Sequence, residues 1–268
     1  MTDSPAKAIP TLELRDGGTI PVVGLGTYSL TGRAGAAAVA DAVRAGYRLI
    51  DSAQGYGNED AVGDGIRESG VDRREILLTT KLPNGDHGYD AALRSFDRSV
   101  AALRMDVVDL YLIHWPMPEQ DRYVDTWKAM IRLRDEGRIR SIGVSNFSEQ
   151  QIERLAAETG ETPAVNQIEL HVGLDQAALR AFHRERGIVT ESYSPLKHGT
   201  ALQQDPVVQR IAAAHHVAWN QVVLRWNLQL GTVVIPRSKD AGRRASNLGV
   251  TGFELTDDEM AAIGALRP

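Results

Sequence analysis

Short apolar segments alternate with amphipathic segments along the whole 268-residue chain, and this alternation limits the fold more than any other feature. Several apolar segments, such as ILLTT and VDLYLI, are almost continuously hydrophobic, which is typical of strands covered on both faces in a parallel sheet. We expect strands at Thr19–Tyr28, Tyr47–Ala53, Ile76–Leu82, Val108–Trp115, Ile139–Ser145, Ala164–Leu170, Ile188–Ser194 and Thr232–Ser238. We expect helices at Ala36–Ala45, near Glu59–Glu68, at Tyr89–Leu103, Arg122–Glu136, Glu149–Thr159 and Gln176–Arg186, across Pro206–Leu230, and after the last strand through Leu248.

Eight strand–helix units in about 250 residues predict an α/β fold of the (β/α)8 barrel type. The preceding residues, LELRDGGTI, predict a small β-hairpin that turns at Asp16–Gly18 and closes the lower end of the barrel. An open doubly wound sheet would be favoured by G-x-G-x-x-G after the first strand. Gly24 and Gly26 supply two of these glycines, but Ser29 stands where the third should fall. The barrel is therefore favoured, as a single domain over residues 1–268, since no linker or low-complexity tract divides the chain.

The composition excludes several classes of function. The net charge is −5 and there is no cysteine, so neither a basic nucleic-acid surface nor thiolate chemistry, a disulfide or a cysteine-ligated metal is expected. The first residues, MTDSPAKAIP, lack the apolar core of an export signal. No apolar run approaches the ~20 residues of a membrane-spanning helix. The sequence predicts a cytoplasmic protein without a metal, without membrane or nucleic-acid partners, and without an obligate protein partner.

Polar residues end three successive strands of the predicted barrel. Asp51 ends the second strand, Lys81 the third and His114 the fourth, and Tyr56 follows Asp51 in a loop. Active sites of such barrels lie at the carboxyl ends of the strands. A structural ion pair of Asp51 with Lys81 is the simpler alternative, but a buried pair is at best weakly stabilising. A charged cluster at this end of the barrel therefore favours a functional role.

These four side chains suit proton donation to a carbonyl. A tyrosine has an ordinary pKa near ~10, and an ammonium at ~4 Å favours the phenolate by up to ~4 kcal/mol. We therefore expect Lys81 to lower the pKa of Tyr56, Asp51 to hold Lys81, and His114 to donate a hydrogen bond to the carbonyl oxygen. The hydride that completes such a reduction must come from a cofactor, because no side chain supplies one.

Four cations lie close together in the eighth unit: Arg237, Lys239, Arg243 and Arg244. With Ser238 as the expected N-cap, they would lie at a helix N-terminus, where the helix dipole disfavours positive charge. A bound anion would resolve this conflict, whereas a solvated basic face is the alternative. A phosphate on a ribose 2′ position fits the cluster and favours NADP over NAD.

The segment GYRLIDSAQGYGNEDAVG, Gly46–Gly63, resembles the G-x-R-x-x-D-T-A-x-x-Y-G-N-E pattern of the aldo-keto reductase family. Six further segments resemble that family in the same order: LTTKL, LYLIHWP, GVSNF (Gly143–Phe147), AVNQIELH (Ala164–His171), SYSPL (Ser192–Leu196) and VIPRS (Val234–Ser238). The resemblance covers nearly the whole chain. It is strongest to bacterial members that are similar to 2,5-diketo-D-gluconate reductase.

The resemblance implies an NADPH-dependent reductase of aldehydes and ketones, including dicarbonyls and diketo sugars, that acts as a monomer. It implies a catalytic set of Tyr56 as general acid, Asp51, Lys81 and His114. The implied substrate pocket contains Tyr28, Tyr56, His114 and Trp115. The implied cofactor residues are Thr27, Asp51, Ser145, Asn146, Gln167, Tyr193, Ser194, Leu196, Ile235, Arg237, Ser238, Arg243 and Asn247. Among these, Ser145, Asn146 and Gln167 would hold the nicotinamide carboxamide and Tyr193 would stack on its ring.

Four positions depart from the family pattern. Ser52 replaces a threonine, and Arg237 replaces a lysine but remains a good phosphate partner. Ser246 stands where an acidic residue often contacts adenine. Pro83 replaces a tryptophan of close relatives, so we expect the substrate pocket to differ from theirs.

Two other functions remain open from the sequence. A barrel glycosidase could use Glu169 and Glu191, which lie near strand ends, although its chemistry has no use for Lys81 beside Tyr56. A non-catalytic NADPH-sensing protein is the other alternative, and the intact acid–base set argues against it.

Overall fold

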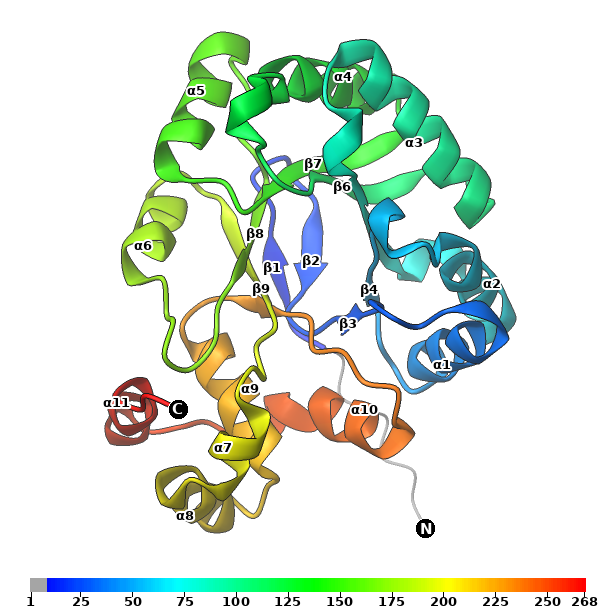
Figure 1. Ribbon diagram of the computed structural model, residues 1–268. Coiled ribbons are helices and arrows are strands. Elements are labelled where there is room, and N and C mark those ends of the chain that lie inside the picture. The colour runs from blue at the N-terminus through cyan, green and yellow to red at the C-terminus, as the bar shows by residue number, and fades with distance from the viewer. Residues whose placement is uncertain (1–8) are drawn as a thin grey trace.

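The computed structural model describes residues 9–268, which form a (β/α)8 barrel with a small N-terminal hairpin (Figure 1). This confirms the predicted fold. The eight parallel barrel strands follow one another in chain order: β3 (Leu25–Gly26), β4 (Leu49–Asp51), β5 (Leu77–Leu82), β6 (Val108–Ile113), β7 (Ile139–Ser145), β8 (Val165–Glu169), β9 (Val189–Tyr193) and β10 (Val233–Val234). Residues 1–8, which contain most of the segment considered for an export signal, lie outside the described part of the chain.

The first and last strands meet and close the barrel. Val23 bridges Val234 in parallel, and the Gly24 and Val234 amides donate to the carbonyls of Val234 and Val22 at 2.8 and 2.9 Å. A Cβ at Gly24 would lie 2.5 Å from Leu49 Cγ, and one at Gly26 would lie 2.8 Å from a backbone oxygen. The two glycines therefore allow strands to approach closely, and they do not form a phosphate-binding turn.

The N-terminal hairpin lies across the opening of the strand ring (Figure 1). Its strands β1 (Thr11–Glu13) and β2 (Thr19–Pro21) are antiparallel, and Gly17 takes a φ of 90° in the turn. Leu14 and Ile20 are buried against the lower barrel interior. The expected single strand Thr19–Tyr28 is wrong, because β2 pairs within the hairpin and ends at Pro21 before β3 enters the barrel wall.

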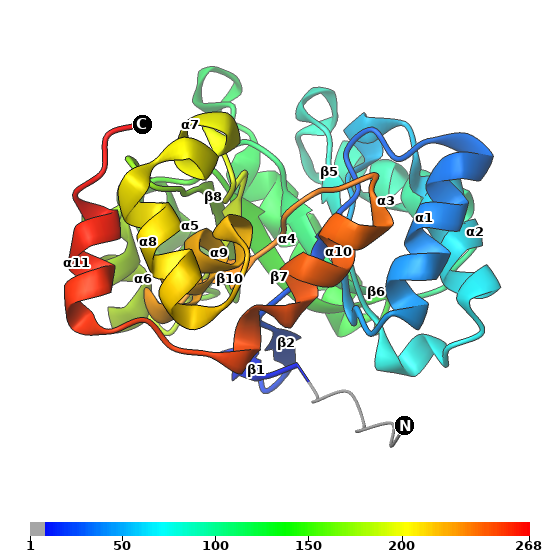
Figure 2. The same ribbon diagram turned by 90° about the horizontal axis from the view of Figure 1, so that it is seen from below.

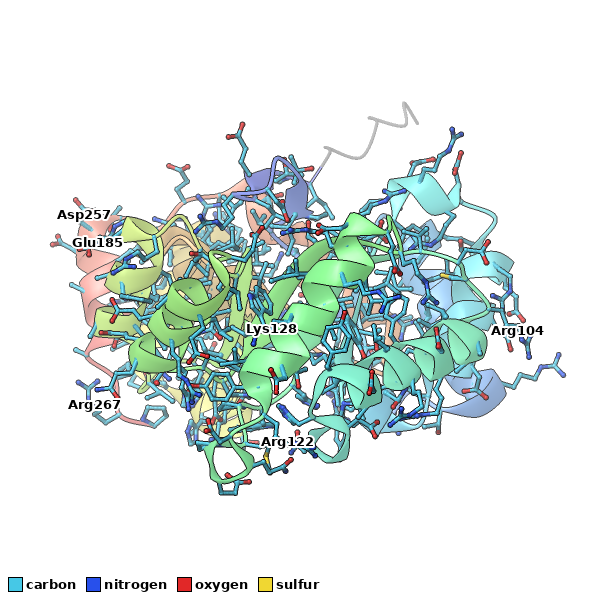
Figure 3. All side chains as sticks on the ribbon, turned by 90° about the horizontal axis from the view of Figure 1, so that it is seen from above. Arg104, Arg122, Lys128, Glu185, Asp257 and Arg267 are labelled. Atoms are coloured by element: carbon cyan, nitrogen blue, oxygen red, sulfur yellow. The ribbon has the colours of Figure 1, made fainter. Side chains whose placement is uncertain are left out.

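Helices surround the strands, with exposed charged side chains on their outer faces, as Lys128, Glu185 and Asp257 of Figure 3 illustrate. The α-helices are α1 (Gly32–Arg44), α2 (Glu59–Ser69), α3 (Tyr89–Leu103), α4 (Tyr123–Asp135), α5 (Glu149–Thr159), α6 (Ala177–Glu185), α7 (Gly199–Gln204), α8 (Pro206–His215), α9 (Trp219–Gln229), α10 (Ala241–Leu248) and α11 (Asp257–Gly264). Five 3-10 turns are η1 (Gln54–Tyr56), η2 (Arg73–Glu75), η3 (Asn84–Asp86), η4 (Pro118–Gln120) and η5 (Gly249–Gly252). None of the helices within residues 9–268 is long and apolar enough to cross a bilayer.

The C-terminal third differs most from the expected pattern. The helical stretches expected across residues 206–230 are α8 and α9, since Asp205 caps α8 and His216, at a φ of 55°, ends it. Helix α7, which precedes them, was not expected. Helix α11 was not expected, and it packs against α8 and α9 on one side of the barrel (Figure 2). Its capping box joins Thr256 to Glu259.

The barrel interior changes from apolar to polar along the strands. Its lower part contains Leu49, Leu110, Val165, Val189 and Val233, which form one buried cluster. Two residues further along β4, β8 and β9 the same inward face presents acids and an amide, since Asp51 follows Leu49, Gln167 follows Val165 and Glu191 follows Val189. Side chains alternate between the two faces of a strand, so the register alone brings these polar groups together.

Candidate active site

The buried pair of Asp51 and Lys81 forms the floor of the site. Asp51 ends β4 and Lys81 lies near the end of the neighbouring strand β5. Lys81 Nζ donates to both Asp51 carboxylate oxygens at 2.8 Å and to the Ser52 carbonyl at 2.7 Å. Burial alone would lower the pKa of Lys81, but the charge of Asp51 and the phenol of Tyr56 outweigh burial and raise it. Lys81 therefore keeps its charge in the interior.

Tyr56 lies above this pair at the end of η1. Its ring centroid is 5.2 Å from Lys81 Nζ, and its ring makes edge contacts with Tyr28 at 5.2 Å and with His114 at 5.9 Å. Asn58 holds the loop, since its side-chain amide donates to the Thr27 and Leu30 carbonyls. The structure thus brings the four expected catalytic side chains together at the carboxyl end of the barrel.

The pKa of Tyr56 departs from its expected direction. Burial raises the pKa, Lys81 lowers it, and the charges of Asp51 and Glu191 raise it again, so the net pKa of Tyr56 lies above its ordinary value. The expectation of a lowered pKa is therefore wrong, because it weighed Lys81 without burial and without the carboxyl groups. A raised pKa keeps the phenol protonated at neutral pH, as a proton donor requires.

His114 provides a neutral ring beside Tyr56. Burial, followed by the charge of Lys81, lowers the pKa of His114 to about 4. A neutral imidazole has one N–H donor and one acceptor nitrogen. At neutral pH the ring can therefore donate a hydrogen bond to an oxygen next to the Tyr56 phenol without bringing in a second positive charge.

The residues expected at the nicotinamide form a connected network. Tyr193 donates to Asn146 Oδ1 at 2.9 Å, and Asn146 Nδ2 donates to Ser145 Oγ at 3.0 Å and to the His114 carbonyl at 3.1 Å. Asn146 has a φ of 63°, which few non-glycine residues adopt and which often marks functional sites. Gln167 joins the network because its carbonyl accepts from Ser145 Oγ at 2.9 Å.

Two glutamates near the strand ends have different surroundings. Glu191 is fully buried in the barrel, where burial and then the charge of Asp51 raise its pKa to about 8. Glu169 lies at the rim, where it pairs with Lys197 at 2.6 Å. The two do not share a site open to a sugar, so the structure gives the glycosidase alternative no support. The sequence indicated Glu191 only as a possible glycosidase carboxylate and did not predict its place next to Asp51.

A continuous groove runs from Tyr56 toward α10. Its inner part has a volume of about 450 Å³ and its outer part about 680 Å³, and both parts include Leu196 and Arg237. The inner part contains the expected residues Thr27, Tyr28, Asp51, Tyr56, Tyr193, Ser194 and Ile235, and the outer part contains Ser238, Arg243 and Asn247. The outer part also contains Trp219, Asn220 and Gln203, which the sequence gave no signal to select.

The basic segment of the eighth unit differs in detail from expectation. Arg237, Lys239 and Arg243 are exposed along the groove, whereas Arg244 is buried and donates to the Lys239 carbonyl at 2.8 Å. Asp240, and not Ser238, is the N-cap of α10, because it accepts from the Arg243 amide at 2.7 Å. A protein carboxylate therefore already occupies this helix terminus, so the case for an anion here rests on the three exposed cations.

Asn247 is held by neighbouring amide and hydroxyl groups. The Asn220 side-chain nitrogen donates to Asn247 Oδ1 at 2.7 Å and to Ser246 Oγ at 3.0 Å. Ser246, which replaces an acidic residue of the family pattern, thereby supports the wall of the groove. The side chain of Asn247, one of the cofactor residues that the family resemblance implies, is thus held in place in the outer groove.

The expected substrate residues stand at the open side of Tyr56. Tyr28 is 61% exposed and Trp115 is 43% exposed. The buried ring of His87 lies with Nε2 3.0 Å from the Trp115 carbonyl, so it tethers the β5–α3 loop to the segment after β6. Pro83 is partly buried in the first of these loops. His114 and Trp115 do not line the groove.

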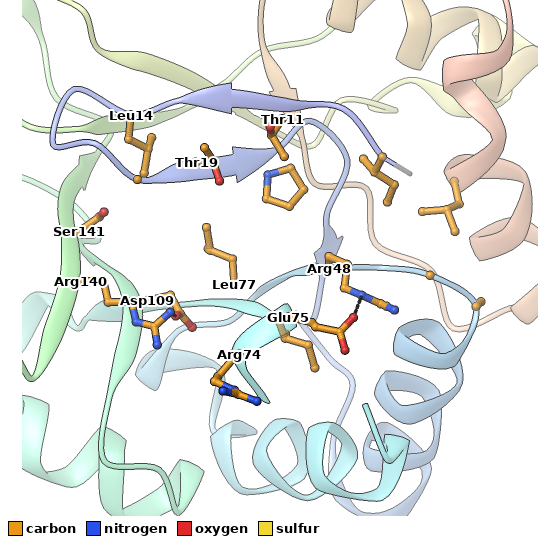
Figure 4. Close-up of a pocket in the computed structure, with 17 residues that line it drawn as sticks. Thr11, Leu14, Thr19, Arg48, Arg74, Glu75, Leu77, Asp109, Arg140 and Ser141 are labelled. Carbon is orange, nitrogen blue, oxygen red and sulfur yellow. Dashed lines mark ion pairs between the residues drawn. The ribbon is translucent and has the colours of Figure 1, made fainter. Parts of the chain in front are cut away.

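A separate groove of about 660 Å³ lies at the opposite end of the barrel, beside the hairpin (Figure 4). Its charged side chains pair with one another or with close neighbours. Arg48 pairs with Glu75 at 3.5 Å, and Arg140 pairs with Asp109 at 3.1 Å. Neither a tyrosine nor a lysine is among the described residues that line this groove, so it does not offer the acid–base set found at the other end.

Comparison with known proteins identifies the family of the chain. Residues 22–268 match the model of the Aldo/keto reductase family. The chain is 49% identical to 2,5-diketo-D-gluconic acid reductase B of Corynebacterium sp. (strain SHS752001), over 96% of this chain and 93% of that protein. It is 45% identical to morphine 6-dehydrogenase of Pseudomonas putida, over 96% of this chain and 91% of that protein. The chain therefore belongs to the aldo/keto reductase family, as the motifs predicted.

Solved structures of the family have the same fold. An aldo/keto reductase from Brucella melitensis superposes with a TM-score of 0.92 at 46% identity, covering 96% of this chain and 99% of that one. A mutant of Gox0644 in complex with NADPH superposes with a TM-score of 0.91 at 46% identity, covering 96% of this chain and 93% of that one.

Proposed function

We propose that the protein reduces the carbonyl group of small aldehydes and ketones to an alcohol with NADPH as the hydride donor. The observation that carries this proposal is the Tyr56 ring above the buried Asp51–Lys81 pair, at the inner end of the groove. Solved relatives in complex with NADPH or NADP support the choice of cofactor.

Residues in and beside the groove suit this cofactor. Tyr193 lines the inner part and would offer a ring face. Ser145, Asn146 and Gln167 lie behind it in the hydrogen-bonded network, and their hydroxyl and amide groups would hold the nicotinamide carboxamide. Arg237, Lys239 and Arg243 are exposed cations along the outer part, and arginine binds phosphate through paired hydrogen bonds. When bound, NADPH supplies a hydride to the carbonyl carbon.

The side chains around the carbonyl perform the proton transfer. His114 donates a hydrogen bond to the carbonyl oxygen and holds it next to Tyr56. Tyr56 gives its proton to this oxygen as the carbonyl carbon is reduced. The ammonium of Lys81, held by Asp51, stabilises the phenolate that remains. The fixed charges thus stabilise the transition state more than the ground state.

The exposed aromatic rings of Tyr28 and Trp115 favour compact substrates with an apolar or planar face, and we propose dicarbonyls and diketo sugars as the class. The two named relatives carry names for different substrates, so family membership alone does not select one. We further propose a cytoplasmic monomer without an obligate protein partner. Light scattering after size-exclusion chromatography tests the oligomeric state.

NADPH oxidation by the purified protein tests the activity. Methylglyoxal, phenylglyoxal, glyceraldehyde and 2,5-diketo-D-gluconate are the substrates, and the same assays with NADH measure the cofactor preference. We expect turnover of at least one dicarbonyl with a higher kcat/KM for NADPH than for NADH. Binding of NADPH without turnover across the panel would instead favour a non-catalytic sensor.

A further inference from the structure

Glu191 is a buried carboxyl group for which the proposed reaction has no use. It lies on β9, directly opposite Gln167 of β8 and Val233 of β10, and faces the barrel interior. Oε2 accepts a hydrogen bond from Gln167 Nε2 at 2.7 Å, whereas Oε1 has no partner among residues 9–268. A buried polar atom without a partner costs free energy, and an apolar side chain would avoid that cost. The position of this carboxyl therefore indicates a role beyond packing.

The effect of Glu191 is on the amide of Gln167. Gln167 Nε2 has two hydrogens, and it donates to Glu191 Oε2 at 2.7 Å and to Asp51 Oδ2 at 2.9 Å. Two flanking carboxyl groups offer acceptors, so they select the orientation in which the amide nitrogen faces both of them. No donor within the described part of the chain reaches the Gln167 side-chain oxygen, which is left as the acceptor that this amide offers.

The same contacts would not hold the amide if one carboxyl were missing. With Asp51 alone, one N–H of Gln167 would lack a partner, and the broad terminal torsion of glutamine would let the amide turn. Glu191 supplies the second acceptor from β9, which pairs with β8, whereas Asp51 reaches the amide from β4, which does not. The amide is thus held from two strands while its oxygen points away from both carboxyl groups.

We propose that Glu191 is a positioning residue for the cofactor, which with Asp51 fixes the Gln167 amide so that its oxygen accepts an N–H of the nicotinamide carboxamide. This inference rests on the proposed NADPH-dependent function and adds a residue to it. The groups facing Glu191 are Asp51, Lys81, Tyr56 and Gln167. Burial and then the charge of Asp51 raise the pKa of its carboxyl.

Matched substitutions of Glu191 test the proposal. Glu191→Gln keeps a neutral acceptor of the same length, whereas Glu191→Met keeps the volume and removes the acceptor. NADPH carries the nicotinamide, and 2′,5′-ADP carries only the adenosine end, so their dissociation constants separate the two ends of the groove. We expect the Met variant to bind NADPH about tenfold more weakly with 2′,5′-ADP affinity unchanged, and the Gln variant to bind both ligands nearly as the wild type does.

Three results would overturn the proposal. The first is an unchanged NADPH affinity in the Met variant. The second is an equal loss of affinity for NADPH and for 2′,5′-ADP in that variant. The third is a Gln variant that loses as much NADPH affinity as the Met variant. Glu191→Leu gives the same comparison if the Met variant does not fold, as judged by circular dichroism. A wild-type protein that neither binds NADPH nor reduces the carbonyl panel contradicts the proposed function itself, before any variant is compared.

Discussion

The two ends of the groove are built on different principles. At the inner end, Asp51, Lys81 and Gln167 are buried, and each makes at least two hydrogen bonds to residues of other segments of the barrel. At the outer end, Arg237 and Arg243 are exposed on the segment that follows β10. The inner end needs exact geometry for proton transfer, whereas the outer end only needs positive charge. Changes at the inner end should therefore affect catalysis and folding, and changes at the outer end only affinity.

The largest expected effect comes from removing the acid. Tyr56→Phe deletes one hydroxyl group and keeps the ring contacts with Tyr28 and His114. We expect kcat for carbonyl reduction to fall by about 10²- to 10⁴-fold, because positioned proton transfer contributes that much. Steady-state kinetics measure this loss, and fluorescence titration checks that NADPH still binds. Near-normal turnover with intact NADPH binding would remove Tyr56 from the role of acid.

The buried ion pair should matter more for stability than an exposed one. Lys81→Met leaves the Asp51 carboxylate buried without its partner, and loss of one partner of a buried pair costs about 3–5 kcal/mol. Lys197→Met is the matched control, because the exposed Lys197–Glu169 pair is worth about 1 kcal/mol or less. Urea unfolding monitored by circular dichroism measures both. Similar free energies of unfolding for the two variants would contradict the expected difference between the buried and the exposed ion pair.

The outer end should control the choice of cofactor. Arg243→Ala removes an exposed guanidinium, and a hydrogen bond to a charged group is worth about 1.5–3 kcal/mol. We expect the dissociation constant for NADPH to rise about tenfold or more, with that for NADH nearly unchanged. The salt dependence of NADPH binding should also weaken. A loss that is equal for both cofactors would show that Arg243 does not act on the 2′-phosphate.

The smallest effect concerns pH and His114. The pKa of His114 is about 4 in the folded protein and about 6.5 in the unfolded chain, so the unfolded chain binds the proton more tightly. The stability that comes from the neutral ring is present above pH 6.5 and is lost as the pH falls toward 4. Between pH 7 and pH 5 this loss is up to about 2 kcal/mol.

His114→Asn removes this titration. The free energy of unfolding should therefore fall less for this variant than for the wild type over that pH range. Equal slopes in urea unfolding at the two pH values would assign the proton uptake to other groups, such as His183, whose pKa burial also lowers to about 4.

The sequence predicted the barrel and the catalytic cluster because both follow from strand register. Asp51, Lys81 and His114 each end an apolar strand, and parallel strands bring such ends to one rim. The family motifs added the roles, which position alone did not define. The same reasoning missed Glu191, since its effect depends on the Gln167 amide of another strand.

Other features depend on three-dimensional surroundings that no local pattern contains. The pKa of Tyr56 is set by burial against three charges from different strands, and the sequence argument used only one of them. Arg244 and Arg243 are adjacent in the chain, yet one is buried against backbone carbonyls and the other is exposed. Trp219 reaches the groove from α9 through the packing of α7 against that helix.

The closure of the barrel between β3 and β10 affects how the protein is made. Arg237 donates to Ser29 across 208 positions of the chain, and the inner groove combines residues from Gly26 to Arg237. The two walls of the groove therefore come from opposite ends of the chain, and the groove can form only after almost the entire polypeptide has been synthesised. Contacts of such long sequence separation also slow folding. The nascent chain therefore has no complete binding site during most of its synthesis.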